Sequence, residues 1–233
     1  MNQLASMLKW EIILQSRYRI IYIAFASVIL YYLMLKVVPM LNSVEMRTTF
    51  LFFDPMLIGI MFVGALVLFE KTENTLQALI VTPIKTSTYL LSKIISLTTL
   101  SLITGTVFLL LTQGFDFNIA YYITGLTLTS ILLILIGFIF VSRCRSLNEY
   151  LLMIMFSFII LFLPPLLHIS KIYENTLFYL WPTQASFIML KGTFTEITII
   201  DTAYAVPYLF IWIFLCYYLA RKAFYTHIIQ GGA

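Results

Sequence analysis

Six long apolar stretches restrict what this chain can fold into. They cover approximately residues 18–38, 50–69, 89–112, 119–141, 150–168 and 204–219, with the second beginning at Phe50 or Pro55. A helix of about 20 apolar residues is long enough to cross the hydrocarbon core of a bilayer. Because 61% of the residues are hydrophobic and only 10% are charged, an ordinary soluble domain is excluded. We therefore predict an all-α, polytopic membrane protein: one transmembrane domain over residues 1–233 with six transmembrane helices.

The first 17 residues have the pattern of a helix that lies on the membrane surface. Leu4, Met7, Leu8, Ile12, Leu14 and Gln15 share one broad face, while Lys9, Glu11 and Arg17 interrupt the remainder. An amphipathic helix of this kind places its apolar side in the headgroup region. We expect an interfacial helix over residues 1–17, with Trp10 at headgroup depth.

Residues 169–202 form the longest segment outside the six stretches, yet they are not hydrophilic. Trp181-Pro182 divides them, and many of their side chains are large and apolar. Such side chains on a free loop would expose an apolar surface to water. Two short, half-inserted helices broken at Trp181-Pro182 explain the segment better. Pro164-Pro165, near the end of the fifth stretch, is expected to break or kink that helix.

The distribution of positive charge predicts the orientation in the membrane. Of the 14 Lys and Arg residues, ten lie at span ends that share one side if both termini are cytoplasmic: Lys9, Arg17, Arg19, Lys71, Lys85, Lys93, Arg143, Arg145, Arg221 and Lys222. The other side holds Lys36, Arg47, Lys171 and Lys191. Cytoplasmic loops carry the excess of Lys and Arg, so we expect cytoplasmic termini. The charges are scattered rather than clustered on one face, which argues against binding to nucleic acid.

Residues 70–93 interrupt the apolar pattern with a short amphipathic element. Leu76, Leu79 and Ile80 fall on one face of a helix, with Glu73 and Gln77 on another. Pro83 disfavours helix at Thr82. A short helix that protrudes from the membrane and then stops is suited to receive force from a partner.

This element resembles the first cytoplasmic loop of type-2 ABC exporter (ABC-2) permeases. That loop reads acidic–x–x–acidic–Gly–Thr–Leu–x–x–Leu–x–x–Thr–Pro, with a Lys about ten residues further on. The matching residues are Glu70, Glu73, Thr75, Leu76, Leu79, Thr82, Pro83 and Lys93. Asn74 replaces the usual Gly, and Asn is the side chain that next best tolerates a left-handed backbone. Thr88 stands where many members have Glu.

The resemblance implies partners and a layout. It makes residues 70–93 a coupling segment whose helix docks on a separate ABC ATPase subunit through Glu70, Glu73, Thr75, Leu76, Leu79, Ile80, Pro83 and Lys85. It also implies a second permease copy, an elbow helix at residues 1–17 and re-entrant helices at 169–202. The expected location is the cytoplasmic membrane of a prokaryote. ATP and Mg would be bound by the partner ATPase, with no cofactor or metal in this chain.

The energy source is predicted from what the sequence lacks. It has no Gly-x-x-x-x-Gly-Lys-Ser/Thr phosphate loop, so uphill transport needs another polypeptide or an ion gradient. Gradient-driven carriers place ionisable groups inside their spans. Here Asp54, Asp116, Glu174, Glu196 and Asp201 are all predicted at or beyond span ends. Asp54, before Pro55, is either a helix cap, which is the commoner situation, or a slightly buried acid. This pattern favours a partner ATPase over proton coupling.

Residues with catalytic potential are few and isolated. His168 and His227 belong to no paired motif, and Cys216 lies in an apolar run. Cys144, between Arg143 and Arg145, is a candidate for a lowered thiol pKa, but no base or second Cys accompanies it. We expect neither an enzymatic nor a metal site, and an intramembrane enzyme is the least favoured function.

Transport of a hydrophobic or amphipathic cargo is the favoured function. The third stretch carries many small hydroxyls, which allow close helix packing and predict a central place in the bundle; a hydroxyl-lined transport surface is the alternative. Aromatic and hydroxyl side chains without charge suit a drug-like compound, lipid or peptide. A lipid-linked surface glycan remains an alternative cargo, and a non-transporting immunity or accessory protein remains an alternative function.

Overall fold

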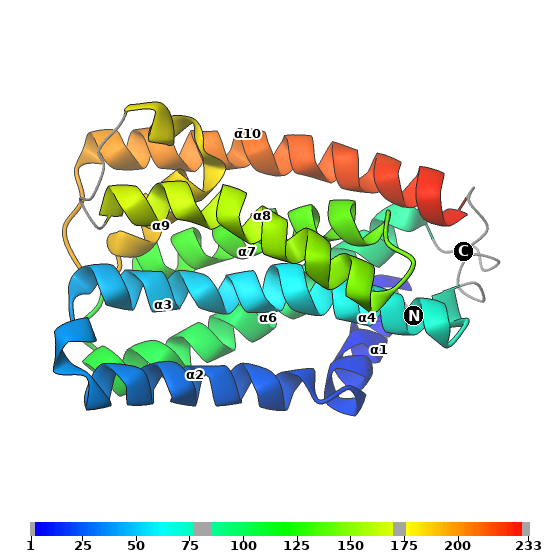
Figure 1. The fold of residues 1–233 in the computed structure, drawn as a ribbon, viewed down its shortest axis with the longest axis horizontal. Helices are drawn as coiled ribbons and strands as arrows, with labels where there is room; N and C mark the ends of the chain where they lie inside the picture. Colours follow the sequence, from blue (N-terminus) through cyan, green and yellow to red (C-terminus); the bar gives the residue numbers. More distant parts are fainter. Residues whose placement is uncertain (1–2, 77–84, 170–175, 230–233) are drawn as a thin grey trace.

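Long helices packed side by side make up the structure, a computed structural model that describes residues 3–76, 85–169 and 176–229. All regular elements in these residues are helical. Six of the described helices are long and apolar enough to cross a membrane: Ile20–Val37, Val44–Thr72, Thr86–Gln113, Ile119–Val141, Leu147–Leu167 and Ile199–Ile228. The predicted all-α fold with six spans is therefore confirmed. Both ends of the chain lie at the same end of the bundle (Figure 1).

The N-terminal helix α1 (Gln3–Arg17) lies obliquely across one end of the bundle and precedes α2 (Ile20–Val37) (Figure 1). Arg19 makes the corner with a left-handed backbone, φ 58°. The buried side chains of α1 are Met7, Glu11, Leu14 and Gln15, and α1 packs against α6 (Thr86–Gln113). The placement of Glu11 on the polar side was therefore wrong, because a buried cation on α6 draws that carboxylate inward.

The second span is longer than predicted and contains Asp54. It consists of α3 (Val44–Met56), the π-helical η2 (Leu57–Phe62) and α4 (Val63–Thr72). Ser43, not Asp54, is the N-cap, and its side chain accepts from the Met46 N–H at 3.3 Å. The interpretation of Asp54 as a cap was therefore wrong, and its alternative, a buried acid, is what the structure shows. Asp54 is an exception to the predicted placement of acids at span ends.

Two threonines explain why the second span begins earlier. The hydroxyls of Thr48 and Thr49 each donate to the carbonyl four residues back, at 2.8 Å. Because these hydrogen bonds satisfy their hydroxyl groups, both side chains can be buried in the bundle. The helix therefore includes residues that the sequence pattern assigned to a polar connection.

The fourth span, α7 (Ile119–Val141), and the second span form the inside of the bundle. Their most apolar windows are 67% and 78% buried, against 56% for α6. The helices cross at Gly137, where an added Cβ would lie 3.1 Å from the Gly59 carbonyl oxygen. Close packing thus depends on small residues of α7 and η2, and the hydroxyl-rich α6 is less central than predicted.

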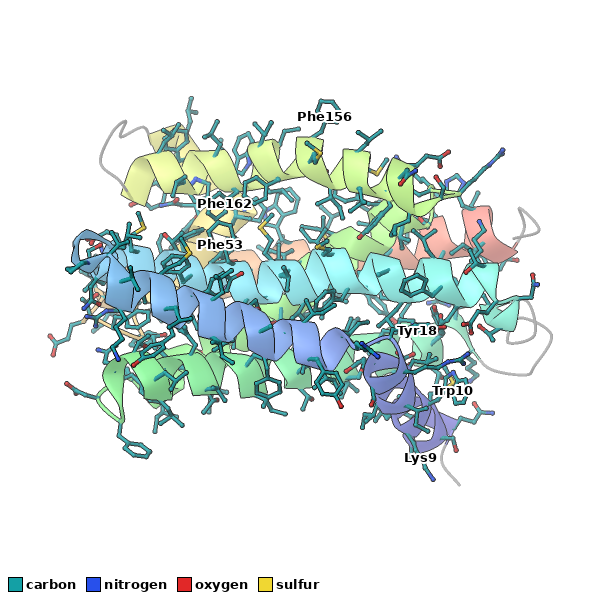
Figure 2. The ribbon with its side chains drawn as sticks, turned by 60° about the horizontal axis from the view of Figure 1, so that its bottom comes forward. Lys9, Trp10, Tyr18, Phe53, Phe156 and Phe162 are labelled. Atoms are coloured by element: carbon teal, nitrogen blue, oxygen red, sulfur yellow. The ribbon has the colours of Figure 1, made fainter. Side chains whose placement is uncertain are left out.

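The fifth span, α8 (Leu147–Ile169), continues through Pro164 and Pro165. A proline has no N–H, so the carbonyls of Ile160 and Leu161 lose their partners within the helix. Trp181 donates its indole N–H to Ile160 O at 2.7 Å, and the Thr183 hydroxyl donates to Leu161 O. A neighbouring segment thus satisfies the carbonyls that the prolines free. On the same helix, Phe162 faces Phe53 of α3 at 4.6 Å between ring centroids, whereas Phe156 points outward (Figure 2).

In its described residues, 176–198, the segment between the fifth and sixth spans contains two short helical pieces. They are the 3₁₀ turn η3 (Thr176–Leu180) and α9 (Pro182–Lys191), followed by α10 (Ile199–Phe224) and the π-helical η4 (Tyr225–Ile229). Trp181 is the extended N-cap of α9, and Pro182 occupies its first turn, as expected of Pro at a helix start. The predicted break at Trp181-Pro182 is confirmed. Most of α9 is buried against α3, α7 and α10, and its half-inserted position in a bilayer stays a prediction.

Candidate functional site

The predicted coupling segment begins where α4 ends. Helix α4 stops at Thr72, and Asn74 takes a left-handed backbone with φ 58°. This is the conformation for which Asn can replace Gly. The hydroxyl of Thr75 donates to the Glu70 carbonyl at 3.0 Å, and Thr75 and Leu76 are helical again. A sharp corner therefore separates the end of the second span from the residues that follow.

Around this corner, four side chains form a buried cluster, called here the charge brace: Glu11, Glu70, Tyr89 and Lys93. The Lys93 ammonium lies 2.9 and 3.0 Å from the two carboxylate oxygens of Glu11 and 2.8 Å from Glu70 Oε1. The Tyr89 hydroxyl donates to Glu70 Oε2 at 2.5 Å. These bonds fill the three donors of Lys93 and join α1, α4 and α6.

The charge brace is isolated from solvent. The side chains of Lys93 and Glu11 are 0% exposed, and that of Glu70 is 6% exposed. Burial raises the pKa of the Glu11 carboxyl above its usual value, and the facing Lys93 ammonium opposes that rise. A pair of buried carboxylates on one ammonium is costly unless its geometry is good and its remaining atoms are hydrogen-bonded, which is the case here.

Three further contacts fix α1 to the same region. Gln15 donates its side-chain amide to the Ser96 hydroxyl at 3.0 Å. Arg17 lies 3.5 Å from Glu73 across the corner, and Tyr18 packs on Phe69 with 4.6 Å between ring centroids. In Figure 2, Tyr18 lies where α1 meets the bundle, while Lys9 and Trp10 point away from it. Helix α1 and the two ends of the predicted coupling segment therefore form one packed unit.

The predicted docking residues differ in their exposure. Glu70 is bound in the charge brace, and Leu76 is 1% exposed within the chain's own core. Thr75 is half-buried, Glu73 pairs with Arg17, and Lys85 is exposed just before α6. Leu79, Ile80 and Pro83 lie outside the described residues. The docking role of this set stays a prediction, and the structure adds an internal bracing role for Glu70 and Leu76.

Sequence reasoning missed Glu11 and the internal partner of Lys93. A signal for Glu11 was present, because Met7, Glu11 and Leu14 are spaced by four and three residues and so share one helical face. An acid on an otherwise apolar face points to a buried partner. The sequence does not say which cation that is, since 82 positions separate Glu11 from Lys93.

The remaining candidate residues form no reactive cluster in the described part of the chain. No three of its His, Cys, Asp and Glu side chains are grouped as metal ligands. Cys144 and Cys216 are free and buried. Burial, with Glu149 adding to it, raises the pKa of the Cys144 thiol, so the lowered value considered from its Arg neighbours was wrong.

Comparison with known proteins gives matches over nearly the whole chain. The model of the fluoroquinolones export permease protein family matches residues 2–232. A protein of Mycobacterium tuberculosis strain CDC 1551 / Oshkosh, named as a fluoroquinolones export permease protein, is 29% identical over 210 residues, which are 89% of each chain. The protein of the same name from strain ATCC 25618 / H37Rv matches with the same identity and coverage.

Proposed function

The chain belongs to the fluoroquinolones export permease protein family, and from this premise we propose that it is the membrane subunit of an exporter of drug-like, amphipathic compounds. The observation that carries the proposal is the family match over residues 2–232. The names of the mycobacterial relatives support the class of cargo. Six helices long enough to span a membrane support a subunit that forms the path.

A separate ABC ATPase supplies the energy in this proposal. The sequence has no phosphate loop of its own, and ATP and Mg belong to the partner. The ATPase binds the end of the bundle that carries both termini and the coupling segment, in the cytoplasm of a prokaryotic cell. Its contacts come from Glu73, Lys85 and the predicted residues Leu79, Ile80 and Pro83, while Glu70 and Leu76 hold the segment to the spans.

The charge brace gives this docking a mechanical consequence. A force on the coupling segment reaches α4 and α6 directly and reaches α1 through Glu11 and Arg17. Packed elements with fixed hydrogen bonds move as units rather than deform. ATP-driven motion of the segment therefore displaces α1 and the ends of two spans together, and a second permease copy provides the other wall of the path.

Transport into inside-out vesicles tests the proposal. Vesicles that contain this chain and its ATPase should accumulate a fluoroquinolone when ATP is added, and a catalytically inactive ATPase should abolish the uptake. Leu79→Asp places a charge in the predicted docking face and should abolish both uptake and co-purification of the ATPase. Phe115→Asp, an exposed change in the turn between α6 and α7, is the matched control and should leave both unchanged. ATP-independent uptake would contradict the proposal.

A further inference from the structure

Asp54 is a buried acid that the coupling mechanism does not use. It lies inside α3 and is 2% exposed. Its Oδ2 accepts the Thr104 hydroxyl of α6 at 2.6 Å. Its Oδ1 has no hydrogen-bond partner among the described residues, and no Lys, Arg or His of those residues is paired with it. The second span thus carries an incompletely satisfied carboxyl group.

The charge brace shows how the same chain accommodates other buried carboxyl groups. Glu11 and Glu70 both accept hydrogen bonds from the Lys93 ammonium, and Glu70 also accepts one from the Tyr89 hydroxyl. Asp54 receives one hydroxyl. A carboxylate inside a membrane costs several kcal/mol without a counter-charge, so acids at such positions mark pathways and binding sites for ions and ligands. A structural role alone would be served equally well by a neutral side chain.

The helix around Asp54 is irregular and borders an apolar pocket. Pro55 follows it directly, and the π-helical η2 starts at Leu57, a feature that often occurs at functional sites. The same turns line a pocket of about 140 Å³ through Phe53, Met56 and Leu57, with Tyr31 of α2 and Phe158 of α8 opposite. Asp54 directly follows Phe53 and lies two residues before Met56, so the acid belongs to the same turns of α3 as the pocket wall.

The pocket and the acid have complementary chemistry. Its lining is almost entirely apolar and includes aromatic rings from three helices, which suits an aromatic ring system. The acid beside it supplies the negative charge that an attached cation requires. Sites for drug-sized ligands usually measure about 300–1,000 Å³, so a pocket of about 140 Å³ is too small for a whole cargo. Binding of a cargo therefore requires the surrounding helices to move apart.

We propose that Asp54 is the counter-charge for a protonated amine on the exported compound, with the adjoining aromatic pocket taking its ring system. This inference rests on the proposed function and narrows its substrate class to amphipathic compounds that carry a protonated amine. In the loaded state the amine pairs with the carboxylate and satisfies Oδ1, and Thr104 keeps its bond to Oδ2. The selectivity of the exporter then includes a charge filter in the second span.

Paired ligands test the charge filter on the purified full-length chain in lipid nanodiscs. One ligand is a fluoroquinolone with a free piperazine amine, and the other is its N-acetylated derivative, in which that nitrogen is uncharged. Asp54→Asn keeps the size of the side chain and an oxygen for Thr104. It should weaken binding of the amine by about 10- to 100-fold, the range for a hydrogen bond to a charged group, and leave the derivative unchanged. Asp116→Asn, a charge-matched change at an exposed turn, should alter neither affinity.

The wild-type chain provides a second measurement that needs no variant to fold. It should bind the free amine at least about 10-fold more tightly than the N-acetylated derivative. Equal wild-type affinities, or an Asp54→Asn variant that weakens both ligands alike or neither, would overturn the assignment while leaving drug export standing. If the wild type binds neither ligand, drug export fails and the charge filter fails with it.

Discussion

At the scale of single residues, Lys93 has the largest predicted effect on stability. Its ammonium group bonds to both carboxylates of the charge brace, from α1 and α4. Removing one member of a buried ion pair leaves uncompensated charge, which costs about 3–5 kcal/mol. The three elements that meet at Lys93 should therefore be sensitive to the loss of this one cation.

Substitution of Lys93 by Met tests that role. We expect Lys93→Met to destabilise the protein by at least about 3 kcal/mol, because Glu11 and Glu70 would face each other without a cation. Glu11→Gln should cost less, since Lys93 keeps Glu70. Lys85→Met, at an exposed position eight residues earlier, should change stability by no more than about 0.5 kcal/mol. Thermal unfolding in detergent measures all three, and similar losses for Lys93→Met and Lys85→Met would show that the charge brace does not stabilise the fold.

At the scale of elements, helix α8 and the segment after it are joined by hydrogen bonds that replace two bonds missing from the helix. Pro164 deprives the Ile160 carbonyl of its usual helical donor, and the Trp181 indole takes that place. Pro165 and Thr183 repeat the arrangement one residue later. The two prolines therefore leave carbonyl groups on the fifth span free to accept hydrogen bonds from its neighbour. Helix α8 continues through them, so of the predicted break or kink the break is absent.

A double-mutant cycle on Trp181 and Pro164 tests this pairing. Trp181→Phe should cost about 1 kcal/mol through the lost hydrogen bond. In a Pro164→Ala background the new Ala N–H can bond to Ile160 O, so the hydrogen-bond part of that cost should disappear. Unfolding free energies of the four proteins give the coupling, which we expect at about 0.5–1 kcal/mol. As a reference, Trp181→Phe combined with Lys191→Ala, on the far end of α9, should be additive. A coupling free energy of zero between Trp181 and Pro164 would show that the indole does not replace the missing helical donor.

The same elements show what the sequence could predict. Period, length and hydropathy predict the six spans, and α7 has the predicted bounds of residues 119–141, because a continuous apolar run between polar turns has one solution in a bilayer. Trp181-Pro182 predicts a break because proline is favoured in the first turn of a helix and disfavoured in its interior. Asp54 and Glu11 were misplaced because side-chain partners distant in sequence decide whether a polar residue is buried. Thr104 lies 50 positions from Asp54, so the local sequence around Asp54 cannot predict that the two side chains meet.

At the scale of the whole molecule, the proposed function depends on which end of the bundle faces the cytoplasm. Both termini, the corner at Asn74 and the loop between α7 and α8 belong to one end, and the turn between α6 and α7 belongs to the other (Figure 1). The charge bias predicts that the first of these ends is cytoplasmic. An ATPase is confined to that compartment, so the coupling segment can be reached from only one side.

Labelling of single cysteines decides the orientation. In a background of Cys144→Ser and Cys216→Ser, Ser146→Cys lies exposed between α7 and α8, and Asp116→Cys lies exposed at the opposite end. A membrane-impermeant maleimide added to intact cells should label the cysteine at 116 and should label the one at 146 only after permeabilisation. Retaining Cys144 gives an internal control, since it is buried and its thiol pKa is raised, so it should react slowly even in permeabilised cells. Labelling at 146 in intact cells would place the coupling segment outside, where no ATPase could drive it, and a correct fold would then serve a different function.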